Sequence, residues 1–147
     1  MTARALAAVL TGVAMVLGGG IMPAGATHLP PFDITRIYPT EAAFQQAIRP
    51  YLDALAADAR HPRAHYWLAI AYLHMHRLHR FRLIDYGSRG LPLAVEAAQK
   101  AVEIDPGFVG TWAALIDMYS LTDEEQKAFG ASQKLVEVGR RIPVPLP

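Results

Sequence analysis

Residues 112–128 read WAALIDMYSLTDEEQKA, a stretch in which large and small residues recur at fixed intervals. Trp112, Leu115 and Tyr119 stand three and then four residues apart, and Ala128 follows nine residues after the tyrosine. The first spacing places three large apolar side chains on one face of a helix. The stretch therefore predicts one amphipathic helix followed, after a short turn, by a second helix that carries Ala128.

The same spacing occurs once more, earlier in the chain. His65, Leu68 and Tyr72 repeat it with histidine in place of tryptophan. Small residues and a proline then follow at spacings of four, three and five residues, at Ala94, Ala98, Ala101 and Pro106. This pattern resembles the tetratricopeptide repeat (TPR), W-x2-L-G-x2-Y followed by A-x3-F-x2-A-x4-P. In the same register, the second helix of a preceding repeat would carry its packing residues at Ala47, Tyr51 and Ala54.

The resemblance implies an all-α fold, a short stack of TPR-like helix–turn–helix repeats with about five helices between residues 40 and 139. The helices are expected to begin near Thr40, after Pro62, near Pro92, near Phe108 and at Thr122. Pro50 should kink or divide the first helix. Thr122 and Glu125 have the spacing of a capping box, and Gly139 suits the end of the last helix.

The N-terminal 26 residues predict a signal peptide. Arg4 precedes an uncharged apolar run over residues 5–17, and Ala24-Gly25-Ala26 follows as a small-residue cleavage site. Cleavage after Ala26 would make the protein periplasmic or extracellular, with no membrane span left in the mature chain. The alternative is an uncleaved N-terminal membrane anchor, since residues 5–26 carry no charge.

Two proline-containing segments flank the helical region. Residues 27–39 show no helical period and predict an extended N-terminal arm, and residues 140–147 predict a Pro-rich tail. A further segment, residues 73–91, is an insertion: Tyr72 and Ala94 are 22 residues apart, where Tyr119 and Ala128 are nine apart. Apolar residues recur in it at every third position from residue 75 to residue 84, which favours a second helix lengthened up to Tyr86-Gly87. A long excursion in a compact repeat is typical of a functional segment.

The insertion is basic. Residues 60–89 hold six arginines and one acid, whereas residues 90–139 hold three lysines and eight acids, so a neutral chain is polarised along its stack. The arginines of the insertion are Arg77, Arg80, Arg82 and Arg89. Because arginine suits carboxylate and phosphate groups, we expect this segment to bind an acidic partner, more tightly below about pH 6.5 where imidazoles charge. Ordinary solubility charge is the alternative.

Five of the six histidines lie within residues 61–79, which raises the question of a metal site. On a helix, His76 and His79 share a face, but the neighbouring arginines would repel a cation. We therefore expect no metal and no cofactor, with His76 and His79 as the ligands if one binds.

The resemblance also implies a concave face lined by the first helix of each repeat. Its members would be Arg63, Tyr66, Trp67, Ile70, His74, Ala113 and Asp117. Tyr66 and Trp67 would supply rigid aromatic contacts, although both residue types also fit a core. With two such helices, the surface would suit a short extended peptide.

Composition excludes several classes of protein. The chain has no cysteine, which excludes disulfides and thiolate chemistry, and a net charge of +1 gives no overall basic field for nucleic acid or for an anionic membrane. It has no serine-hydrolase, phosphate-loop or zinc-protease motif, so we do not expect an enzyme. The sequence predicts an exported protein–protein interaction module, an adaptor or accessory subunit of an extracytoplasmic complex. A small-ligand, anion or metal-binding protein and a homo-oligomer joined through basic and acidic ends are the alternatives.

Overall fold

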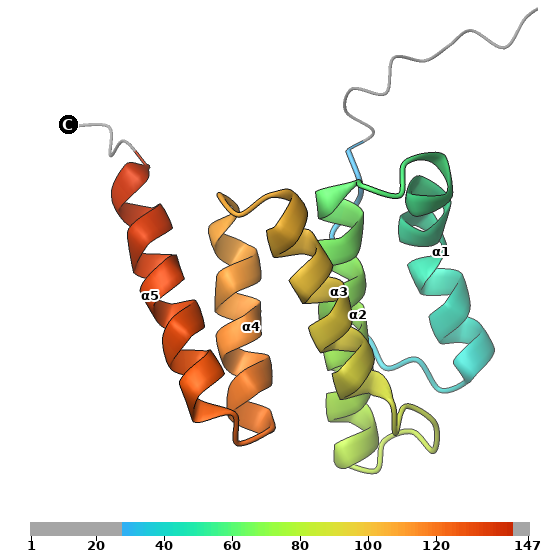
Figure 1. Ribbon diagram of the computed structural model, residues 1–147. Coiled ribbons are helices and arrows are strands. Elements are labelled where there is room, and N and C mark those ends of the chain that lie inside the picture. Colours follow the sequence, from blue (N-terminus) through green and yellow to red (C-terminus); the bar gives the residue numbers. More distant parts are fainter. Residues whose placement is uncertain (1–27, 143–147) are drawn as a thin grey trace, which may run out of the picture.

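The computed structural model describes residues 28–142, and over that range the chain is helical with no strand (Figure 1). Its helices are α1 (Glu41–Ala57), α2 (Pro62–Arg80), α3 (Gly90–Ile104), α4 (Val109–Leu121) and α5 (Glu125–Arg141). The prediction of an all-α, TPR-like stack of about five helices is confirmed. The predicted signal peptide and residues 143–147 of the predicted tail lie outside the described residues. None of the helices in residues 28–142 has both the length and the apolarity to span a bilayer.

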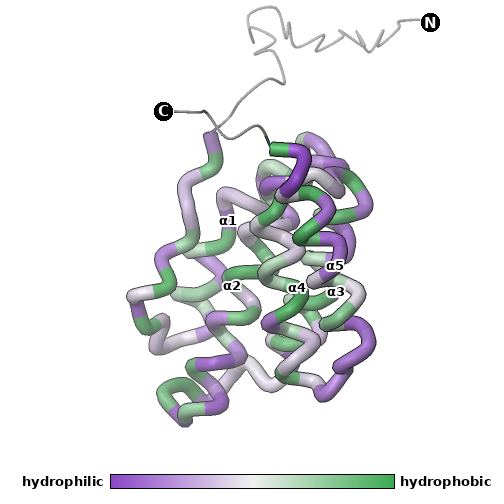
Figure 2. The backbone as a smooth tube through the Cα atoms, turned by 90° about the vertical axis from the view of Figure 1, so that its left-hand side faces the viewer, coloured by the Kyte–Doolittle hydropathy of each residue, from purple (hydrophilic) through white to green (hydrophobic). Residues whose placement is uncertain are grey.

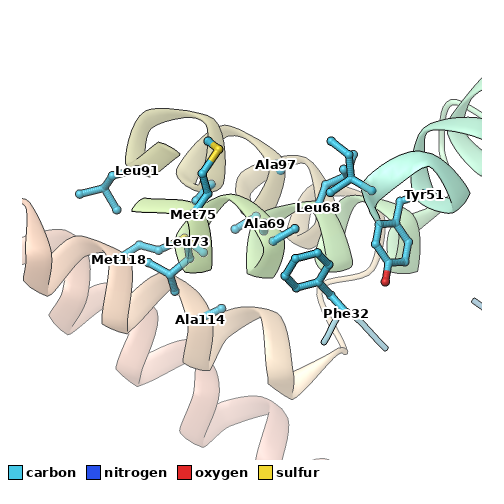
Figure 3. Packing of buried hydrophobic residues seen from close by; sticks show 14 of the residues in the cluster. Phe32, Tyr51, Leu68, Ala69, Leu73, Met75, Leu91, Ala97, Ala114 and Met118 are labelled. Atoms are coloured by element: carbon cyan, nitrogen blue, oxygen red, sulfur yellow. The ribbon is translucent and has the colours of Figure 1, made fainter. Parts of the chain in front are cut away.

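Alanines on the facing sides of the helices let the stack close. Ala69 of α2 and Ala94 and Ala98 of α3 are fully buried, which brings the two helix backbones together. Gly90 extends this contact, because a Cβ at that position would lie 2.8 Å from the carbonyl oxygen of Tyr72. Large residues fill the remaining space, and Figure 3 shows Leu73 and Met118 between α2 and α4.

Two side chains define where the first helices start. The Thr40 hydroxyl accepts a hydrogen bond from the backbone N–H of Ala43 at 3.2 Å, which caps α1. His61 does the same for α2, because its Nδ1 accepts from the N–H of Ala64 at 3.2 Å. One histidine of the predicted cluster therefore has a structural role.

The turn between α4 and α5 differs from the predicted capping box. Thr122 ends α4, and its hydroxyl donates to the carbonyl of Tyr119 at 3.1 Å instead of capping α5. Asp123 follows with a positive φ of 56°, and the N–H of Glu124 donates to the same carbonyl at 3.0 Å. Thr122, which was expected to cap α5, is used to finish α4, so α5 begins at Glu125 without a side-chain cap.

Of the two effects predicted for Pro50, division of the helix is wrong, and the kink stays a prediction. α1 is one continuous helix through Pro50, which does not divide it. Pro50 and Gln46 are both exposed, so the carbonyl that loses its helical donor lies on the solvent side. The end of α5 lies close to Gly139, as predicted, but Gly139 is not the capping residue, because α5 continues for two residues to Arg141.

The N-terminal arm is packed onto the stack. Phe32 and Tyr38 are 5% and 4% exposed, and the phenol of Tyr51 in α1 donates to the carbonyl of Pro30 at 2.9 Å. Figure 1 shows residues 28–39 running along α2, on the side away from α3, before they enter α1. In the TPR register α1 is the second helix of a repeat, so the arm takes the packing position of that repeat's missing first helix.

Candidate functional site

A strip of partly exposed side chains runs along α2 and α4 on the face that the resemblance predicts to be concave. We call Arg63, Tyr66, Ile70, Ala113 and Asp117 the concave strip; all five are exposed or partly exposed. Arg63, Tyr66 and Ile70 are three and then four residues apart on α2, so they lie on one side of that helix. Ala113 and Asp117 are four residues apart and lie on one side of α4. Arg77 of α2 and Asp117 of α4 form an ion pair across the strip, with each side chain about half exposed. The structure thus brings residues of the two helices to one surface.

One end of the concave strip is aromatic. The Tyr66 ring lies edge-on to Phe108, with ring centroids 4.8 Å apart, and also 4.8 Å from the ring of Trp67. The Arg63 guanidinium lies 3.6 Å above the Phe108 ring. These contacts hold Tyr66 and Arg63 in place before any partner binds. Sequence reasoning missed Phe108 as a site residue, and its position directly before α4 was the one signal available in the sequence.

Gly110 allows this aromatic cluster to form. A Cβ at position 110 would lie 3.0 Å from the Phe108 ring and 3.4 Å from the Tyr66 hydroxyl oxygen. Burial raises the pKa of the Tyr66 phenol above its ordinary value. The phenol is therefore a neutral hydrogen-bonding group at physiological pH.

Two residues predicted for the concave face have other positions. The His74 imidazole Nε2–H donates to the carbonyl of Arg36 at 2.9 Å, and the ring lies 5.9 Å from Phe32 and 6.2 Å from Tyr38. His74 therefore holds the arm, because the arm covers that part of α2. Trp67 is partly buried and packs against the core, which was the alternative to a binding role.

The basic insertion is only partly a loop. α2 continues to Arg80, and residues 81–89 then form the connection to α3. Arg77 is paired with Asp117, whereas Arg80, Arg82 and Arg89 make no ion pair within 4 Å among residues 28–142. An open cavity of about 680 Å³ lies beside the loop, lined by residues that include His79, Arg80, Arg82 and Asp85. The insertion therefore places unpaired guanidinium groups around a hollow.

The two histidines considered as metal ligands lie where the loop returns to α2. Their Nδ1 atoms are buried and have no hydrogen-bond partner in the described part of the chain. Burial, and then the charges of Arg80, His79 and Arg77, lower the pKa of His76. The pKa of His76 therefore lies below that of a free imidazole, which reduces the share of His76 in the predicted tightening of binding at mildly acidic pH. Within residues 28–142, no three histidine or acidic side chains are placed to hold a metal ion.

Two further surfaces lie on α5, and sequence reasoning missed both. A cavity of about 540 Å³ opens between the ends of α3, α4 and α5, with Trp112 in its wall. The Trp112 indole N–H donates to the carbonyl of Pro106 at 2.8 Å, so this donor is already used. On the outer side of α5, Phe129 and Val136 are 64% and 52% exposed.

Comparison with known proteins supports the fold assignment. No protein-family model and no curated protein matches the chain. Among solved structures it is similar to "MamA RS-1 ArsTM double mutant", a TPR-containing protein, with a TM-score of 0.53 and 27% sequence identity. The match covers 66% of this chain and 47% of that one, so the chain spans about half the length of its structural neighbour. The similarity supports a TPR-like helical fold of the kind that serves as a protein-interaction module.

Proposed function

We propose that this protein is an exported protein-interaction module, an adaptor or accessory subunit of an extracytoplasmic complex. It binds a short segment of its partner on the concave strip between α2 and α4. The observation that carries the proposal is the strip itself, where Arg63 and Tyr66 are held by Phe108 and remain partly exposed. Rigid aromatic and arginine side chains lose little freedom on binding, which is why such residues dominate protein interfaces.

The dimensions of the concave strip suit an extended peptide. From Arg63 to Arg77 the helix rises about 21 Å, which matches about six residues of extended chain. The aromatic end offers an apolar surface beside one guanidinium, and the other end offers the Arg77–Asp117 ion pair. A bound segment with an apolar residue followed by polar ones would meet both ends. Because the arm covers α2 at His74, such a segment must lie toward α4.

Export is supported by the sequence of residues 1–26. The mass of the protein purified from the envelope should correspond to a chain that begins at Thr27. An intact N-terminus on a membrane-bound protein would favour the uncleaved anchor, and a cytoplasmic protein would contradict export.

A surface variant that blocks the concave strip tests the proposed function. Ala113 is exposed on α4, and Ala113→Arg would place a long side chain across the strip without disturbing the core. Ala56→Arg adds the same side chain at another exposed alanine, on α1, and serves as the matched control. Affinity capture from the envelope fraction should recover a protein with the wild type and the control that Ala113→Arg loses. Recovery of the same proteins with all three would overturn the proposal.

An anion-binding role has one observation in its favour, the hollow lined by His79, Arg80 and Arg82. Asp85 lines the same hollow and opposes an anion there. If this site takes a free anion, inorganic phosphate should raise the melting temperature of the wild type and leave that of Arg82→Gly unchanged.

A further inference from the structure

The end of α2 carries an apolar and basic protrusion that the proposed function does not use. We call Arg80, Phe81, Arg82 and Leu83 the basic tip. Phe81 is 72% exposed and Leu83 is 53% exposed, each next to an arginine. Figure 2 shows the loop after α2 projecting from the lower end of the molecule, with hydrophobic and hydrophilic segments side by side. Phe81 is the most exposed of the large apolar side chains that the structure describes, and Leu83 is exposed two residues away, so this pair needs an explanation.

The backbone of the basic tip is held in a fixed conformation. The N–H of Arg82 donates to the carbonyl of His79 at 2.9 Å, and the N–H of Leu83 donates to the carbonyl of Leu78 at 2.9 Å. These two bonds form the helix-ending motif in which the residue at position 82 takes a positive φ, here 59°. The tip therefore projects from a capped helix end.

Arginine is an unexpected residue at that position. Glycine occupies most such sites, because a side chain at positive φ is strained. After α4 the corresponding residue is Asp123, and a short polar side chain tolerates this conformation better than a long one. The chain therefore keeps a guanidinium at position 82 at a cost to folding, which indicates a role outside folding.

The charges around the basic tip are mainly positive. Arg80 and Arg82 make no ion pair among the described residues, while Arg77 is neutralised by Asp117. Asp85 is the acid that shares the adjoining cavity with them. The basic tip thus combines two apolar side chains with two unpaired guanidinium groups.

We infer that the basic tip binds the surface of a membrane that contains anionic phospholipids. Phe81 and Leu83 insert among the lipid headgroups, and Arg80 and Arg82 contact the phosphates. A protein partner would need a hollow shaped for this convex tip and about 800 Å² of contact area on each partner, which four residues do not supply. A lipid interface adapts its shape, so a small tip is sufficient. The inference does not rest on the concave strip and stands or fails separately from the proposed function.

Vesicle sedimentation tests the inference with the purified protein and its variants in the same processed form. Phosphatidylcholine vesicles with and without phosphatidylglycerol are compared at low and high salt. The wild type should sediment with the anionic vesicles at low salt and much less at high salt or without the anionic lipid. Phe81→Ser combined with Leu83→Ser should abolish the binding. Phe129→Ser combined with Val136→Ser, an equally exposed pair on α5, is the matched control and should bind as the wild type does.

Arg82→Gly separates membrane binding from stability. Glycine removes the strain at positive φ, so the melting temperature should rise by a few degrees, while vesicle binding should fall about fivefold. A tip with a purely structural role would gain stability and keep its binding, which would overturn the inference. The inference would also be overturned if the wild-type protein did not sediment with anionic vesicles or if it bound only inorganic phosphate. Tip variants that bind vesicles normally but lose an acidic protein partner would overturn it too.

Discussion

The two ends of the helical stack are finished in different ways. At the α1 end, the arm buries Phe32 and Tyr38 against Phe44 and Tyr51 and is tied down by phenol and imidazole hydrogen bonds. At the α5 end, Phe129 and Val136 face outward. In a stack where each helix contacts mainly its neighbours, an end is stable only if something covers it. Non-helical chain can serve in place of a helix at one end, and the stability of the two ends should therefore differ.

Truncating one phenylalanine at each end of the stack should reveal the largest difference between the two ends. Phe32→Ala removes a ring that is 5% exposed and should lower the free energy of unfolding by about 3 kcal/mol. Phe129→Ala removes a ring that is 64% exposed and should change it by less than about 0.5 kcal/mol. Urea denaturation measures both. Equal costs would mean that the arm is not part of the folded core.

Gly90 in α3 and Gly130 in α5 should respond to alanine substitution in opposite ways. A Cβ on Gly90 would lie within 3.0 Å of three backbone atoms of α2, so Gly90→Ala should destabilise the protein by about 2 kcal/mol. A Cβ on Gly130 would meet nothing within 4 Å, so Gly130→Ala should stabilise α5 by about 1 kcal/mol. Thermal unfolding of both variants measures whether each substitution raises or lowers the stability. A Gly90→Ala variant that is as stable as the wild type would show that the α2–α3 contact is not as close as the structure has it.

Alkaline pH should weaken the arm end first. Burial raises the pKa of Tyr51 to about 12, and its phenol donates to the arm. The unfolded phenol ionises near pH 10 and loses its proton before the folded one, so the free energy of unfolding should fall above pH 10 until the folded pKa is passed. Tyr51→Phe should cost about 1 kcal/mol at neutral pH and show a weaker alkaline fall. If the stability of Tyr51→Phe falls above pH 10 as much as that of the wild type, the fall is caused by the other tyrosines.

Mild acid should act on the α2–α3 junction and leave α5 unaffected. Burial and the neighbouring positive charges lower the pKa of His76. As the pH falls below about 6.5 the unfolded chain takes up the proton first, so the free energy of unfolding decreases and continues to do so until the folded pKa is passed. His76→Gln should reduce this loss. Amide hydrogen exchange measured as a function of pH should show that α2 loses protection in mild acid while α5 keeps it. An equal loss of protection in both helices would contradict this prediction.

Helix periodicity predicted the fold because it depends on residues that are close in sequence. The face carrying Leu115 and Tyr119, and the alanines of α3, repeat at helical spacing, and both sets are buried. The turn after α4 was mispredicted because Thr122 is near two helix ends and can cap only one of them. Pro50 was judged by its effect within a helix, whereas its exposed position makes the lost hydrogen bond tolerable.

The site was harder to predict because it depends on contacts between distant residues. Phe32 and Tyr38 lie in a segment without periodicity, so neither their burial nor the loss of His74 to the arm could be inferred from spacing. Arg77 was assigned to the insertion and Asp117 to the concave face, yet the two form one ion pair. Helix register indicates which side a residue faces, but the side chain opposite it is set by the tertiary structure.

Photo-crosslinking in living cells directly tests whether the concave strip binds a partner. A photoreactive amino acid is placed at Ala113 on the strip and, as the control, at Ala56 on α1, both exposed positions. We expect a discrete protein adduct from position 113 in the envelope fraction and none from position 56. An adduct from position 56 with none from position 113 would contradict it.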